Sequence, residues 1–75
     1  MVSEMCVLDT TGHSRHIWDP NIPAEVDAAR QHFDGLRKKG YVAYRVKGDG
    51  ESGEIMRDFD PQAGKVILSP PLAGG

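Results

Sequence analysis

The chain has 75 residues, a formal net charge of −2 and 39% hydrophobic residues. This length leaves room for one small domain, which buries only about 60% of the surface that its unfolded chain exposes. A deep catalytic cleft is therefore not expected, and we expect a protein that is not an enzyme. The acidic balance argues against nucleic acid as a partner. No apolar run approaches the ~20 residues of a membrane span, so no membrane partner is expected.

Cys6 is the only cysteine in the sequence. A single cysteine cannot form an internal disulfide, which suits a reducing cytoplasm. Because Cys6 lies midway along a predicted strand over residues 2–8, the sequence predicts a small buried residue rather than a nucleophile. We therefore expect a cytoplasmic protein in which Cys6 has a structural role.

The N-terminal part of the chain predicts a β-hairpin. Residues 2–8 and 13–18 have the composition and alternation of strands. The turn signal Asp9-Thr10-Thr11-Gly12 separates them, with Gly12 available for a positive φ. Asp19-Pro20-Asn21 ends the second strand, because proline and the residue before it both interrupt regular pairing.

One amphipathic helix is predicted between Pro23 and Gly40. Acids follow the proline and three bases precede the glycine, which matches the polarity of the helix dipole. Apolar residues in this segment step by three, four and three positions, which predicts one face buried against a sheet. The stripe consists of Val26, Ala29, Phe33 and Leu36. Arg30 and Lys38 are expected to stay exposed.

Three further strands are predicted after the helix, over residues 41–46, 55–59 and 65–68. The order β-β-α-β-β-β predicts an α+β roll in which the helix packs on one face of a single sheet. A polar glycine loop over residues 47–53 separates the first two of these strands. The short turn over residues 60–64 suits a direct hairpin between the fourth and fifth strands. A turn that carries the chain across the sheet is the alternative.

The chain ends in Ser69-Pro70-Pro71-Leu72-Ala73-Gly74-Gly75, directly after an apolar run. Prolines fix φ and favour an extended path, which holds a tail away from the domain. Glycine has no Cβ, so Gly74 and Gly75 fit a slot too narrow for any side chain. We therefore expect a domain over residues 1–69 and a flexible tail over residues 70–75, with the Gly75 carboxylate as the reacting group.

The order of elements resembles the β-grasp fold of ubiquitin-like proteins. Residues 64–75 resemble the end of the sulfur carriers, such as the molybdopterin synthase small subunit, in which a glycine turn, an apolar strand, Pro-Pro and Gly-Gly follow in this order. The resemblance implies a mixed sheet whose last strand lies centrally, beside the first. It also implies that a ubiquitin-activating-type enzyme adenylates Gly75, with Gly74 allowing entry. That partner supplies ATP and Mg²⁺, and this chain binds no cofactor or metal. Tail recognition is assigned to Pro70, Pro71, Leu72 and Ala73.

Three functions are compatible with the sequence. A bacterial ubiquitin-like modifier passes the adenylated terminus as a thioester to targets, with a conjugating enzyme and a deconjugating protease as further partners. A sulfur carrier instead receives sulfur as a C-terminal thiocarboxylate from a sulfur-transfer enzyme. The tail favours the sulfur carrier, whereas the unfamiliar domain favours the modifier. A small protein-binding module with an incidental tail is the alternative from another class.

Two other patterns carry weaker signals. Residues 48–53 fit G-x-G-x-x-G, but a strand-like segment follows and Asp49 and Glu51 repel phosphate, so a hairpin loop is favoured. A calcium site here lacks the dense oxygen spacing that this ion needs. His13 and His16 are three apart on a predicted strand and point to opposite faces, which predicts surface histidines rather than a metal pair.

Overall fold

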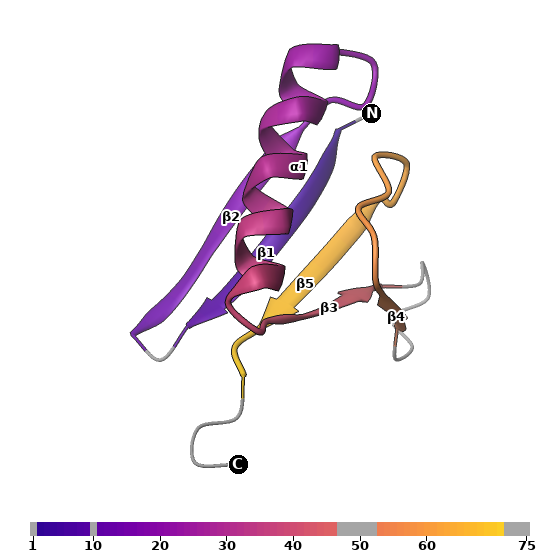
Figure 1. Ribbon diagram of the computed structural model, residues 1–75. Coiled ribbons are helices and arrows are strands. Elements are labelled where there is room, and N and C mark those ends of the chain that lie inside the picture. The colour runs from indigo at the N-terminus through magenta and orange to yellow at the C-terminus, as the bar shows by residue number, and fades with distance from the viewer. Residues whose placement is uncertain (1, 10, 47–52, 72–75) are drawn as a thin grey trace.

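The computed structural model describes residues 2–9, 11–46 and 53–71. These residues form an α+β domain in which one helix lies across one face of a five-stranded mixed sheet (Figure 1). The elements are β1 (Ser3–Asp9), β2 (Gly12–Trp18), α1 (Pro23–Lys38), β3 (Val42–Arg45), β4 (Glu54–Met56) and β5 (Lys65–Ser69). The predicted element order is confirmed.

The last strand lies in the centre of the sheet. The spatial order is β2-β1-β5-β3-β4, so β5 lies between β1 and β3. It runs parallel to β1, with Met5 opposite Val66, and antiparallel to β3, with Ala43 opposite Leu68. The fourth strand pairs with β3 instead of β5. The segment between β4 and β5 therefore carries the chain across the sheet, and the direct hairpin does not form.

Strand alternation and the helical stripe build one core. Side chains of one parity on each strand face α1, whereas the opposite parity faces away from it. Phe33 is fully buried, and Val26 and Leu36 are partly buried against the same core, as predicted. Arg30 and Lys38 are exposed. The buried apolar residues are Met5, Val7, Trp18, Ala29, Phe33, Ala43, Met56, Ala63, Val66 and Leu68.

The predicted strand over residues 55–59 ends early, at Met56. Phe59 turns toward the core, where its ring lies 5.2 Å from the Trp18 ring and 5.5 Å from the Phe33 ring. The indole Nε1 of Trp18 donates a hydrogen bond to the Pro61 carbonyl at 3.1 Å. These contacts hold the segment that leads into β5 against the core, so the chain leaves the edge of β3 after Met56.

Cys6 lies on the face of the sheet that α1 leaves uncovered. It is half-buried, opposite Ile67 of β5 and Arg15 of β2. The expectation of a buried cysteine is wrong here, because the core-facing positions of β1 are Met5 and Val7. No helix among the described residues combines the length and apolar character needed to cross a membrane.

Candidate functional site

The root of the C-terminal tail is the part of the predicted site that the structure describes. Pro70 is partly buried and Pro71 is exposed, directly after the last residue of β5. Leu72, Ala73, Gly74 and Gly75 lie outside the described residues, as does residue 1 and the segment 47–52 of the glycine loop. The expected flexibility of the tail therefore stays a prediction.

The tail root leaves the sheet beside the end of α1. Ser69 is opposite Val42 in the antiparallel pair of β5 and β3, so the start of β3 lies next to the exit of the tail. Pro71 lies close to Gly40, which precedes β3. A Cβ placed on Gly40 would lie 3.4 Å from the Pro71 Cβ and 3.6 Å from its Cγ. Two segments that are thirty-one residues apart in the sequence therefore lie side by side at this point.

The turn at Gly40 has the hydrogen bonds of a Schellman motif. The Gly40 N–H donates to the Arg37 carbonyl at 3.0 Å, and the Tyr41 N–H donates to the Leu36 carbonyl at 3.1 Å. Gly40 has φ of +95°, a conformation that residues with a Cβ rarely adopt. Glycine is therefore favoured here by the backbone conformation, whereas an added Cβ would make only an ordinary van der Waals contact with Pro71.

Basic residues precede this turn. Arg37 donates through Nη1 to the Tyr41 carbonyl at 2.7 Å, while its Nε is buried without a hydrogen-bond partner. Lys38 and Lys39 are exposed. We define the tail-root surface as Arg37, Lys38, Lys39, Gly40 and Pro71. Within the described part of the chain, the ion pairs join Glu4 to Arg15, Glu4 to Lys65 and Arg45 to Asp60, so none involves this surface.

The structure brings together a pair of histidines that the sequence did not connect. His16 of β2 stacks on His32 of α1, with ring centroids 5.1 Å apart and planes at 19°. Partial burial of His32 lowers its pKa below the usual 6.5, and the nearby His16 and Lys39 lower it further. His13 is exposed, as expected for a surface histidine. Among the described residues no group of three or more potential ligands gathers to hold a metal ion.

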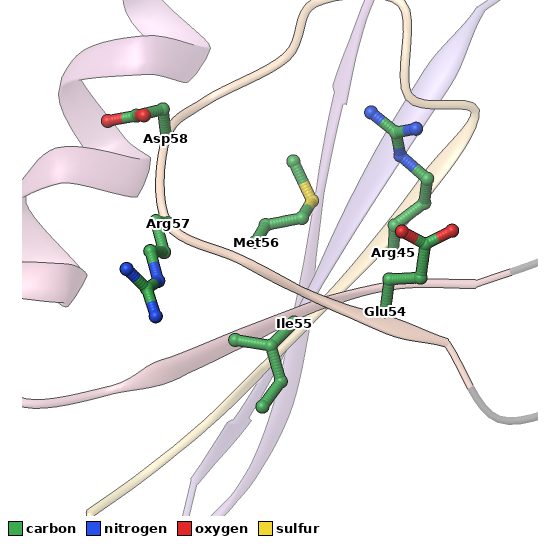
Figure 2. Close-up of a pocket in the computed structure, with 6 residues that line it drawn as sticks. All are labelled: Arg45, Glu54, Ile55, Met56, Arg57 and Asp58. Atoms are coloured by element: carbon green, nitrogen blue, oxygen red, sulfur yellow. The ribbon is translucent and has the colours of Figure 1, made fainter.

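A shallow cavity lies beside β4. Arg45, Glu54, Ile55, Met56, Arg57 and Asp58 line it (Figure 2). Figure 2 shows Arg45 and Glu54 side by side, while Ile55 points to the opposite side of the strand. The guanidinium of Arg45 forms its ion pair with Asp60. One lining side chain, Arg45, is thus already held by an ion pair, and none of the predicted site residues lines the cavity.

The end of the G-x-G-x-x-G pattern lies in a strand connection. Gly53 directly precedes β4, so no helix N-terminus follows to bind a phosphate. A Cβ on Gly53 would lie 1.7 Å from the Arg45 carbonyl oxygen, so glycine is required by close backbone approach. The prediction of a strand after this loop is confirmed.

Comparison of the chain with protein-family models, with curated proteins and with solved structures found no match.

Proposed function

We propose that this protein is a ubiquitin-like modifier of the β-grasp fold, used through its C-terminal Gly75 carboxylate. The observation that carries the proposal is the position of β5. This strand is central in the sheet, parallel to β1, and continues into Ser69-Pro70-Pro71. A tail that starts from the middle of the sheet has a fixed origin, because hydrogen-bonded strands flank β5 on both sides.

In the proposed reaction the chain supplies a substrate terminus and the partner supplies the catalytic groups. A carboxylate oxygen of Gly75 attacks the α-phosphorus of ATP, which forms an acyl adenylate and releases pyrophosphate. A cysteine thiolate of the activating enzyme then attacks the acyl carbon, forms a thioester and expels AMP. A lysine amine of the target finally displaces the thiolate, forms an isopeptide bond and loses a proton.

The composition of the tail suits a terminus that acts as the substrate of another enzyme. Gly74 and Gly75 have no side chains, so the terminus fits a narrow channel of the activating enzyme. Pro70 and Pro71 restrict the backbone of the tail root, which lowers the entropy lost when the tail becomes ordered in the enzyme. Leu72 and Ala73 are the residues proposed for recognition by that channel.

A sulfur carrier is the second candidate, and the tail sequence favours it. Gly64, the apolar strand β5, the Pro70-Pro71 pair and the Gly-Gly terminus follow in the order found in that class. Activation begins with the same acyl adenylate. Hydrosulfide then displaces AMP and leaves a thiocarboxylate on Gly75. Where the donor is an enzyme persulfide, its attack expels AMP and forms an acyl disulfide, which a second thiol cleaves to the thiocarboxylate and a disulfide.

The test is exchange of labelled pyrophosphate into ATP, catalysed by purified ubiquitin-activating-type enzymes in the presence of Mg²⁺. We expect exchange with the unmodified chain and none with Gly75→Val, whose side chain blocks the narrow channel. Gly64→Ala is the matched control, because a Cβ at Gly64 meets no atom within 4 Å. Equal exchange with the unmodified chain and Gly75→Val would contradict the proposal.

A further inference from the structure

We propose that the tail-root surface docks on the enzyme that activates Gly75, and that the enzyme surface facing it is acidic. The inference rests on the proposed function and adds to it the position and charge of the contact. It follows from the reach of the tail, the rigidity of its root and the charges around it.

The tail is short, which limits the distance between Pro71 and the Gly75 carboxylate. Four residues follow Pro71 in the sequence, and four fully extended residues span at most about 14 Å. The reacting carboxylate therefore stays within about 14 Å of Pro71. A protein interface of standard size covers about 800 Å² on each partner, which corresponds to a patch of about 16 Å radius. An enzyme whose active site receives Gly75 must therefore cover the surface around Pro71.

The end of α1 is fixed relative to the tail root. Gly40 lies close to Pro71, and the pairing of Val42 with Ser69 holds the start of β3 beside the end of β5. The two hydrogen bonds of the Schellman motif join this turn to the last helical turn. Arg37, Lys38 and Lys39 therefore keep a defined position when a partner approaches Pro71.

The tail-root surface is positively charged. Lys38 and Lys39 are exposed cations that the ion pairs of the described residues leave uncompensated. The backbone carbonyl of Tyr41 holds Arg37 in place through Nη1. The chain as a whole is acidic, with a net charge of −2, so this basic cluster departs from the average surface. Complementary charge at the rim of an interface speeds association and fixes orientation, which favours carboxylates on the partner.

The experiment compares charge reversal at this surface with charge reversal elsewhere. The probe is the purified adenylating enzyme that gives Gly75-dependent pyrophosphate exchange with the unmodified chain. The test variant is Lys38→Glu/Lys39→Glu, and the matched control is Arg57→Glu, an exposed cation beside β4. Circular dichroism and thermal unfolding confirm that each variant is folded before the kinetic comparison.

We expect the KM for the double variant to rise about tenfold with kcat unchanged, because two exposed charges change from attraction to repulsion. The KM for Arg57→Glu should stay within about twofold of the unmodified chain. Salt provides a second readout that a structural defect would not produce. Added salt screens both interactions, so it should raise the KM of the unmodified chain and lower that of the double variant.

Two negative results have different meanings. If the unmodified chain is activated and the double variant has the same KM and salt dependence as Arg57→Glu, the docking surface is wrong and the proposed function stands. If no adenylating enzyme gives Gly75-dependent exchange with the unmodified chain, the proposed function and the docking surface are both overturned.

Discussion

Pro71 lies against Gly40, at the point where α1 has ended and β5 leaves the sheet. A Cβ on Gly40 would come within 3.4 Å of the proline ring. The end of the helix and the root of the tail are therefore neighbours, although no sequence pattern in either segment predicts this.

Gly40→Ala should lower the free energy of unfolding by about 1–2 kcal/mol, because alanine is strained at a φ of +95°. Urea denaturation followed by Trp18 fluorescence measures this change. Gly35→Ala is the matched control, since Gly35 lies within α1 and a Cβ there meets no atom within 4 Å. It should raise the free energy of unfolding by about 1 kcal/mol. Two changes of the same sign would contradict the assignment of the turn.

Phe33→Ala should destabilise the domain by about 3–5 kcal/mol, because it removes a fully buried ring that contacts Phe59. A domain of this size has a small free energy of unfolding, so circular dichroism should show that the variant is largely unfolded at 25 °C. Phe33→Leu keeps most of the apolar volume and should remain folded with a lower midpoint of denaturation. Asp34→Ala, at an exposed position, serves as the control. A native-like midpoint for Phe33→Ala would show that the stripe is not the core face of α1.

The stacked histidines should make stability depend on pH. The pKa of His32 is lowered in the folded state by burial, by His16 and by Lys39. The unfolded chain therefore binds more protons than the folded chain as the pH falls through 6.5, and the free energy of unfolding falls with it. Well above pH 6.5 His32 is neutral in both the folded and the unfolded state, so its titration does not lower the free energy of unfolding there. NMR titration of the imidazole signals measures the pKa directly and should find it below 6.5.

His32→Gln should flatten the part of the stability profile just below pH 6.5. His13→Gln is the control, because His13 is exposed and lies on the opposite face of the sheet from the stacked pair. An equal loss of pH dependence in both variants would show that the pair is not its source.

Local patterns predicted the elements well. The spacing of Val26, Phe33 and Leu36 indicated the buried face of α1, and the bases before Gly40 indicated its end. These features depend on neighbours within one or two turns, so they are visible in the sequence. The early end of β4 was not visible, because it depends on Phe59 packing against Trp18, a residue forty-one positions earlier.

The position of β5 could not be decided from the sequence for the same reason. Residues 60–64 have a turn composition, and the structure confirms a turn in which Asp60 accepts a hydrogen bond from the Gln62 N–H. The hydrogen bond from Trp18 to the Pro61 carbonyl anchors this turn near the end of β2 instead of beside β4. The stacking of His16 on His32 is equally nonlocal.

The most direct test of the central claim is mass spectrometry of the products formed with the activating enzyme, ATP, Mg²⁺ and the downstream enzymes or sulfur donor. The account predicts a covalent product at Gly75 that depends on ATP. A peptide in which Gly75 is joined to a lysine identifies the modifier. A mass increase equal to the replacement of one oxygen by one sulfur identifies the sulfur carrier. Full biological activity in a chain that lacks Gly74 and Gly75 would contradict both.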